Sequence, residues 1–259
     1  MSLAWGLIMR RLQCALLAAA AAIGFASIAS AADMPVKARP MPVVAAYNWT
    51  GWYIGIDGGW GRARYGHNFN IDGHYNNAPG ETYDYSKSGG LLGGHLGYNW
   101  QMGQWVFGLE GGITKTWLDS SNNVSPFFPV NDRWSSKVSW IGTITPRLGY
   151  AFGNILLYGK GGWAIARVND YVNDTVDFVD FNTTRSGWTL GAGIEYMFTP
   201  NWILGVEYNH YDFGSANVTA SSTPIAGGAT FFPGTNHDFK VTVDAVQGRL
   251  SYKFGSLWP

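Results

Sequence analysis

Apolar and polar residues alternate along most of this chain with a period of two. Between residues 188 and 198, for example, Trp188, Leu190 and Ile194 alternate with polar or small residues, among them Glu195. Strict alternation over about ten residues predicts a β-strand with one apolar face and one polar face. The pattern predicts eight strands, near residues 50–61, 90–102, 105–117, 136–152, 155–168, 187–198, 202–213 and 240–254.

The connections between these strands alternate in length. Three are short and suit tight turns, since they contain glycine, asparagine or proline: Gly103-Gln104, Gly153-Asn154 and Thr199-Pro200-Asn201. Four are long and polar, and they are expected to be loops near residues 62–89, 118–135, 169–186 and 214–239. Alternation of short and long connections predicts an antiparallel up-and-down arrangement.

Every second strand ends with one aliphatic and two aromatic residues on its apolar face. The first case is Leu96-x-Tyr98-x-Trp100, and the pattern returns at residues 148–152, 194–198 and 250–254. In an antiparallel meander these ends lie at one level, as do the aromatic girdles of membrane barrels. The predicted girdle consists of Tyr98, Trp100, Tyr150, Phe152, Tyr196, Phe198, Trp202, Tyr252 and Phe254.

The polar face of the strands carries charges. In a soluble sandwich these charges, such as Glu195 and Glu207, would face solvent. The loop alternation, the aromatic repeat and an export signal together favour an all-β, eight-stranded antiparallel up-and-down transmembrane β-barrel, with four long outer loops and three short periplasmic turns. Closure satisfies every backbone group, and eight strands leave an interior filled by side chains. The charges expected inside are Asp57, Glu110, Arg147, Lys160, Glu195, Glu207 and Arg249, joined by His95, Asn99 and Gln247.

The amino terminus resembles an export signal. A basic Met9-Arg10-Arg11 precedes an apolar stretch that begins at Cys14, and Ala29-Ser30-Ala31 supplies small residues for cleavage. Residues 1–31 are therefore predicted to be a secretory signal peptide. A membrane anchor is disfavoured because the apolar stretch is short, and a lipoprotein because Cys14 lies at its start. The remaining divisions are a periplasmic linker at residues 32–47, the barrel at 48–255 and an extension at 256–259.

Composition narrows the possible functions. Charged residues make up 13% of the chain and the formal net charge is zero, so no basic field exists to attract nucleic acid. Cys14, the sole cysteine, lies in the predicted signal peptide. The exported chain therefore has no disulfide and no thiolate nucleophile.

No sequence spacing predicts an enzyme. The histidines are scattered, at His67, His74, His95, His210 and His237, and none lies at a spacing that places a nucleophile beside a base and an orienting group. No catalytic residue, cofactor or metal site is therefore expected. His67 and His74, in the first predicted loop, remain an alternative pair of haem or metal ligands.

The predicted loops also contain aromatic residues, which would contact lipopolysaccharide or another surface, or pack together as a cap. They are Tyr65, Phe69, Tyr75, Tyr83, Tyr85, Phe127, Phe128, Phe178, Phe181, Phe231 and Phe232.

Several motifs, in order along the chain, resemble the small outer-membrane porins and surface antigens of alphaproteobacteria. They include Trp49-Thr50-Gly51-Trp52-Tyr53-Ile54-Gly55, Gly97-Tyr98-Asn99-Trp100-Gln101, Pro146-Arg147-Leu148-Gly149-Tyr150-Ala151-Phe152 and Thr199-Pro200-Asn201-Trp202. This family is similar to OmpA-type transmembrane domains and opacity-type surface antigens. The resemblance implies a barrel in the outer membrane of a Gram-negative bacterium with surface-exposed loops. Members usually end at or just after the last aromatic strand, whereas this chain continues past Phe254.

The function expected from these observations is a mainly structural surface protein that maintains membrane integrity and has at most a narrow pore. The alternatives are a porin for small solutes, and a receptor whose loops bind a ligand such as haem or a host surface. Expected partners are outer-membrane lipid, lipopolysaccharide and the barrel-assembly machinery, and the expected state is a monomer or a small homo-oligomer.

Overall fold

The computed structural model describes residues 47–69, 80, 82–124, 133–173, 177–219, 223–224 and 236–254. The predicted signal peptide, nearly all of the predicted linker and the extension at residues 256–259 lie outside these ranges. Within the described residues, no helix is long and apolar enough to cross a membrane.

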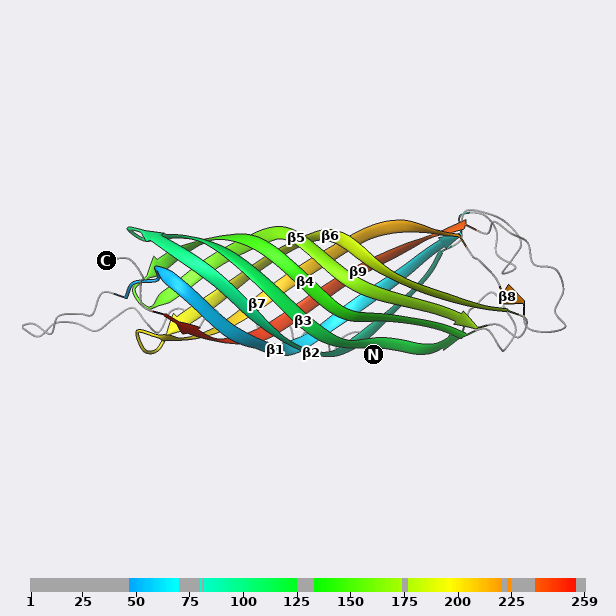
Figure 1. Ribbon diagram of the computed structural model, residues 1–259, viewed down its shortest axis with the longest axis horizontal. Coiled ribbons are helices and arrows are strands. Elements are labelled where there is room, and N and C mark those ends of the chain that lie inside the picture. Colours follow the sequence, from blue (N-terminus) through cyan, green and yellow to red (C-terminus); the bar gives the residue numbers. More distant parts are fainter. Residues whose placement is uncertain are drawn as a thin grey trace, which may run out of the picture. The chain divides into compact units, whose positions relative to one another are not determined.

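The described residues form one antiparallel sheet that closes on itself (Figure 1). Eight long strands follow the order β5-β4-β3-β2-β1-β9-β7-β6, and β5 pairs with β6 to complete the barrel, while the two-residue β8 pairs only with β6. This confirms the predicted eight-stranded antiparallel barrel. The strands are β1 (Gly51–Phe69), β2 (Thr82–Met102), β3 (Trp105–Val124), β4 (Arg133–Phe152), β5 (Ile155–Asn173), β6 (Asp177–Met197), β7 (Trp202–Thr219), β8 (Thr223–Pro224) and β9 (Asn236–Lys253).

The strands are longer than the hydrophobic pattern predicted. Pairing of β1 with β2 continues to Asn68 and Thr82, so the predicted loop boundaries at residues 62 and 89 are wrong. The predicted boundaries of the other three long loops are wrong in the same direction, since β3, β5 and β7 end later and β4, β6 and β9 begin earlier. The physical reason is that strand pairing uses backbone groups, which pair equally well beneath polar side chains.

The three short connections form the tight turns that were predicted. Gly103 and Gly153 adopt positive φ angles of 63° and 65°, which glycine adopts without steric cost. At the third turn, the Trp202 amide donates to Thr199 Oγ1 at 3.0 Å. The end of β9 lies at the same level, where the amide of the next residue, Phe254, donates to the carbonyl of Trp52 at 2.8 Å.

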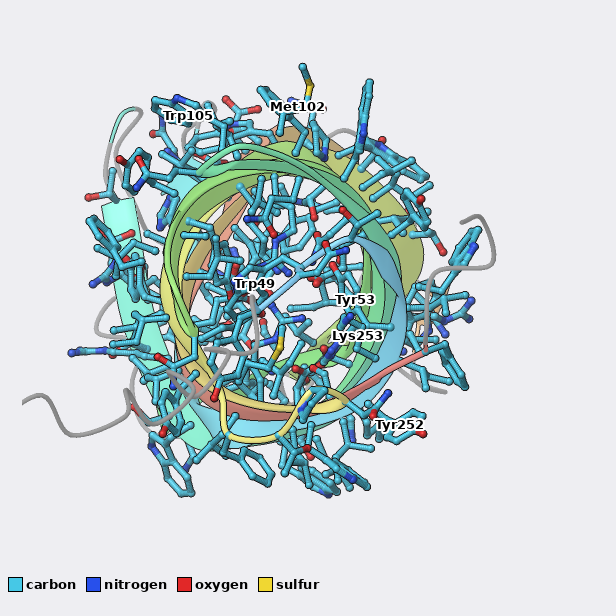
Figure 2. All side chains as sticks on the ribbon, turned by 90° about the vertical axis from the view of Figure 1, so that its left-hand side faces the viewer. Trp49, Tyr53, Met102, Trp105, Tyr252 and Lys253 are labelled. Carbon is cyan, nitrogen blue, oxygen red and sulfur yellow. The ribbon has the colours of Figure 1, made fainter. Side chains whose placement is uncertain are left out.

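Side chains alternate between the outside and the interior of the barrel. Leu109 is 57% exposed, whereas the next residue, Glu110, is 3% exposed. Viewed from the tight-turn end, Trp49, Tyr53 and Lys253 lie inside the ring of strands and Trp105 lies outside it (Figure 2).

One face assignment from the sequence is wrong. Unbroken alternation along residues 136–152 predicts that Val138 shares the outward apolar face of Trp140, but Val138 is fully buried inside the barrel. The register between β4 and β5 shifts between these two residues. A β-bulge adds one residue to a strand and reverses its alternation from that point.

The interior is layered. An apolar layer next to the tight turns consists of Trp49, Val106, Ala151, Leu156, Tyr158, Met197 and Ile203. A second apolar layer fills the opposite half and consists of Ala63, Tyr65, Leu91, Leu118, Val138, Ile141, Ala164, Ala166, Val168, Tyr211, Phe213, Phe239, Val241, Val243 and Ala245. Seven buried charged residues, described below, lie between the two layers.

Candidate functional site

The seven charges predicted to face the interior meet there in one cluster, called the interior network below. Arg249 on β9 is its centre. Its Nη2 lies 2.6 Å from Glu110 Oε2 and its Nε lies 3.1 Å from Asp57 Oδ1. Arg249 also forms an ion pair with Glu207. The members are Asp57, Glu110, Arg147, Lys160, Glu195, Glu207 and Arg249.

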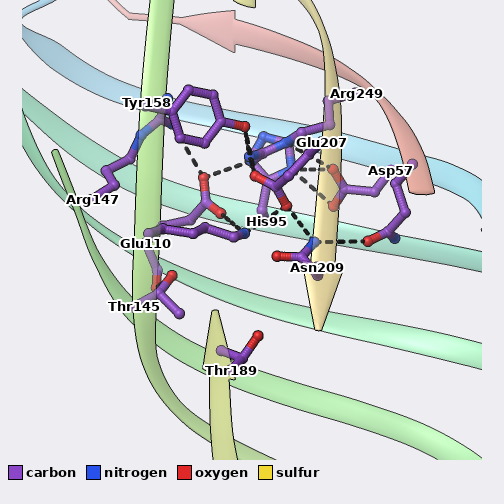
Figure 3. Close-up of polar contacts among 12 residues, drawn as sticks. Asp57, His95, Glu110, Thr145, Arg147, Tyr158, Thr189, Glu207, Asn209 and Arg249 are labelled. Atoms are coloured by element: carbon purple, nitrogen blue, oxygen red, sulfur yellow. Dashed lines mark hydrogen bonds and ion pairs between the residues drawn. The ribbon is translucent and has the colours of Figure 1, made fainter. Parts of the chain in front are cut away.

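The other two cations, Arg147 and Lys160, contact Glu195, Glu110 and Glu207. Figure 3 shows Arg147, Glu110, Tyr158, Glu207, Arg249 and Asp57 close together in the interior. Arg147 Nη2 lies 2.7 Å from Glu195 Oε2, and its Nη1 lies 3.4 Å from Glu110 Oε2. Lys160 Nζ bridges two carboxylates, at 3.0 Å from Glu110 Oε1 and 2.7 Å from Glu207 Oε1. Glu110 therefore contacts all three cations. Mutual pairing of this kind is what a buried charge requires, because an isolated one is costly.

Two tyrosines that sequence reasoning missed complete the network. Tyr53 donates its hydroxyl hydrogen to Glu110 Oε2 at 2.9 Å, and Tyr158 donates to Glu207 Oε2 at 2.6 Å. The Arg147 guanidinium also lies 3.9 Å from the centre of the Tyr158 ring, within the range of a cation–π contact. The alternation of the strand could have predicted the position of Tyr158, since it is two residues before Lys160 and therefore lies on the same inward face.

His95 links the network to a serine. Its Nδ1 lies 2.9 Å from both carboxylate oxygens of Asp57, and its Nε2 lies 2.8 Å from Ser251 Oγ. The sequence-based statement that no nucleophile, base and orienting group would come together is therefore wrong. The Asp57–His95–Ser251 hydrogen-bond series has the connectivity of a serine-hydrolase triad. Its three residues come from three separate strands.

The surroundings of this hydrogen-bond series differ from those of an open active site. Ser251 is 2% exposed and His95 is 5% exposed. Asp57 also accepts a hydrogen bond from Arg249 Nε at 3.1 Å. A substrate carbonyl has no free approach to the Ser251 hydroxyl. We therefore interpret the Asp57–His95–Ser251 series as an extension of the interior network.

The neutral residues predicted beside the charges behave differently from one another. Gln247 Oε1 accepts from Asn209 Nδ2 at 3.4 Å, and the same Asn209 nitrogen donates to Glu207 Oε1 at 2.6 Å. Asn99 is buried, but its side chain forms no hydrogen bond with the described residues. Asn99 therefore lies in the interior without joining the network, contrary to expectation.

The nine aromatic residues of the predicted girdle lie on the outward face near the tight turns. Neighbours among them are in contact. The ring centres of Trp202 and Tyr252 lie 5.2 Å apart, and those of Tyr150 and Phe152 lie 4.7 Å apart. Tyr252 and Phe254 form a further edge-to-face pair at 5.2 Å.

A second group of outward tryptophans, which sequence reasoning missed, lies farther from the turns. It consists of Trp60, Trp117, Trp163 and Trp188, all exposed. Trp163 and Trp188 are direct cross-strand partners. On β1, Trp52 and Trp60 are separated by eight residues, which corresponds to about 20 Å along the axis of a tilted barrel. The apolar band of an outer-membrane barrel is about 25 Å tall.

Tyr65 and His67 were predicted to lie in an exposed loop, and this is wrong. Both are on β1 and buried inside the barrel, at 0% and 1% exposure. The His67 ring stacks on Phe239 with ring centres 4.6 Å apart, and its Nε2 lies 3.3 Å from the Tyr85 hydroxyl. The strand extension explains both errors, since it continues the alternation into the segment that had been assigned to a loop.

The remaining candidates are placed as follows. His210, on β7, contacts Asp244 at 2.8 Å on the outward side. No group of three or more His, Cys, Asp or Glu suited to a metal ion occurs among the described residues. Outside the described residues or side chains lie His74, His237, Phe69, Tyr75, Phe127, Phe128, Phe178, Phe181, Phe231 and Phe232.

Comparison with known proteins agrees with this architecture. The family described as the outer membrane protein beta-barrel domain matches residues 18–254. The chain belongs to this family. A 31 kDa outer-membrane immunogenic protein of Brucella melitensis is 33% identical over 240 residues, which cover 89% of this chain and 95% of the relative. A 22 kDa outer membrane protein of Rhizobium leguminosarum is 33% identical over 192 residues, covering 74% and 77%.

Among solved structures, the outer membrane protease OmpT of Escherichia coli matches with a TM-score of 0.50. The match covers 79% of this chain and 97% of OmpT at 10% identity, so it shows the fold alone. The resemblance inferred from the motifs is confirmed, and the protein is an outer-membrane β-barrel of a Gram-negative type. In such barrels the short turns face the periplasm and the opposite end faces the cell exterior.

Proposed function

We propose that this outer-membrane barrel is a structural surface protein that maintains membrane integrity and has a closed interior. The observation that carries the proposal is the interior network, in which four carboxylates and three cations from different strands form ion pairs across the lumen. None of the seven is more than 8% exposed. An open porin instead leaves its polar interior in contact with water.

The layers on either side of the network support the same conclusion. Toward the exterior, the apolar layer contains Tyr65, Leu118 and Phe239, each fully buried. Toward the periplasm, the Trp49 indole Nε1 donates to the Gly153 carbonyl at 3.1 Å and closes over the end of the barrel (Figure 2). Solute passage would require all three layers to rearrange.

The outward face supports a stable position in the membrane. The two aromatic groups are separated by about 20 Å, close to the height of about 25 Å of the apolar band of an outer-membrane barrel, and aromatic rings favour the interface between hydrocarbon and water. Leu96, Leu109 and Ile113 are among the exposed apolar residues between them. The partners in this proposal are outer-membrane lipid and lipopolysaccharide, and the barrel-assembly machinery during insertion. The Brucella relative is named an immunogenic protein, which fits a surface-exposed barrel.

Single-channel recording in a planar bilayer tests the proposal. The wild-type barrel is expected to show no steady unitary current. A charge-neutral double variant, Glu110→Ala with Arg249→Ala, removes the central pair and is expected to conduct, which also demonstrates insertion. The matched control, Asp119→Ala with Lys137→Ala, removes an exposed pair of 3.0 Å and is expected to remain closed.

A shift in gel mobility on boiling verifies that each variant is folded before recording. Steady unitary currents from the wild-type protein would overturn the proposal and favour a porin for small solutes.

A further inference from the structure

Three cationic side chains cluster on the outer wall of the barrel, just beyond the second group of tryptophans. Arg62 and Arg64 follow Trp60 on the outward face of β1, and Lys240 lies on the outward face of the neighbouring β9. All three are exposed. Residues two apart on a strand are about 7 Å apart, so the two arginines are neighbours.

The strand register brings the lysine to the same place. Gly66 pairs with Lys240 and Arg64 pairs with Thr242, which makes Arg64 and Lys240 diagonal neighbours across the two strands. Diagonal neighbours lie about 7–8 Å apart, within reach of long side chains. The three cations can therefore approach a single small anion.

A groove lies between these side chains. Its volume is about 440 Å³, and its lining includes Arg62, Arg64 and Lys240 together with Ser86 and Thr242. Gly66 contributes no side chain to the wall, and a Cβ at this position would come within 2.8 Å of Asp84 Oδ1. The charged groups of the lining are three cations and one carboxylate, Asp84. A further carboxylate beside the groove, that of Asp212, lies 3.8 Å from Lys240 Nζ.

The arginines are held in position by neighbouring polar side chains. Asp244 lies 2.7 Å from Arg64 Nη1, and it also accepts from Tyr208 at 2.6 Å and contacts His210 at 2.8 Å. Arg62 Nη2 donates to Ser86 Oγ at 2.6 Å. Since a guanidinium has five N–H donors, each arginine keeps donors for a further anion after these contacts.

We infer that this groove binds the phosphate of an anionic lipid headgroup in the outer leaflet. The position decides the source of the phosphate. The cations lie on the lipid-facing side of the wall, immediately beyond the tryptophans that mark the end of the apolar band, where headgroups are found. Arginine pairs bind phosphate with two parallel hydrogen bonds, and lysine adds a point charge. A phosphorylated glycolipid of the lipopolysaccharide class has this chemistry.

Native mass spectrometry of the full-length exported barrel in detergent provides the test, with lipid A as the probe. The wild-type protein is expected to retain bisphosphorylated lipid A. The triple variant Arg62→Gln, Arg64→Gln and Lys240→Gln is expected to bind it at least about tenfold more weakly. Lipid A without phosphate is expected to bind both proteins equally weakly. The matched control, Lys137→Gln, removes an outward cation elsewhere on the wall and is expected to bind like the wild type.

Two outcomes would overturn the assignment. Equal binding of lipid A by the wild type and a folded triple variant would show that the cluster does not bind the headgroup. Equally tight binding of inorganic phosphate, without lipid, would identify a site for a soluble anion. The inference rests on the proposed contact with outer-leaflet lipid, but not on the closed interior, because conductance and lipid A binding are measured separately.

Discussion

Arg249 and Glu110 form an ion pair of 2.6 Å although 139 residues separate them in the sequence. Their strands, β9 and β3, are not neighbours in the sheet, since β1 and β2 lie between them. The pair therefore spans the interior and exists only because the sheet closes. This contact links barrel closure to the obstruction of the lumen.

Arg147→Ala is expected to lower stability and to raise conductance together. The substitution removes the 2.7 Å partner of Glu195, whose remaining ion-pair contact among the described residues is Arg249 at 3.7 Å. Loss of one partner from a buried pair costs about 3–5 kcal/mol. Urea unfolding in lipid vesicles measures the free energy, and planar-bilayer recording measures the current.

The control for this variant is Lys137→Ala, which disrupts an exposed pair worth roughly 0–1 kcal/mol. Equal stability and equal conductance of Arg147→Ala and the wild type would show that the network does not obstruct the lumen.

Leu109→Arg is expected to destabilise the folded barrel by about 2–4 kcal/mol, because the side chain faces hydrocarbon near the middle of the apolar band. Trp117→Arg introduces the same charge on the same strand, but in the outer tryptophan group, where the charge penalty falls to roughly 0–1 kcal/mol. Equilibrium unfolding in vesicles compares the two variants. A larger charge penalty at Trp117 would contradict the proposed membrane position.

Val138→Asp is expected to destabilise the barrel by about 3–5 kcal/mol, since it places an uncompensated charge in the buried outer apolar layer. Lys137→Asp, one residue earlier, changes an exposed outward position and is expected to cost far less. The same unfolding measurement compares them. The reverse order would show that β4 has no bulge between Val138 and Trp140 and that its alternation continues unbroken.

A fluorophosphonate probe for activated serines is expected to leave folded protein unlabelled. Ser251 has the hydrogen-bond partner of a nucleophile, His95 at 2.8 Å, but its burial prevents access by the reagent. Mass spectrometry of the treated barrel detects any adduct. Labelling that disappears in Ser251→Ala would show that the serine is accessible and would reopen the question of an enzymatic function.

His95→Ala tests the structural role of the same chain. Removal of the imidazole leaves buried Asp57 without its two contacts at 2.9 Å. An unsatisfied buried polar group costs about 1–3 kcal/mol, and the expected loss of unfolding free energy is of that order. Unchanged stability would mean that Arg249 alone satisfies Asp57.

The amino-acid sequence alone determined the faces of the strands near the tight turns. Glu110 and Leu109 could be assigned to opposite sides because alternation is a local property of an extended backbone. The turn at Gly153 could be predicted for a similar reason, since glycine tolerates the positive φ that the turn requires. The number of strands followed from these local signals, and so did the aromatic repeat.

Only the tertiary structure decided which charges meet. Whether Arg249 pairs with Glu110 depends on the register of every strand between them and on the stagger of the strands at closure. No local sequence pattern determines the combined effect of these registers. The bulge after Val138 could not be predicted from the sequence. The strand has apolar residues on both faces near the bulge, so the reversal of the alternation does not change the polarity pattern. His67 was assigned to a loop because its neighbours are polar, yet backbone pairing extends β1 past it and turns its ring inward against Phe239. Side-chain polarity is read one residue at a time, whereas pairing and closure are properties of the whole sheet.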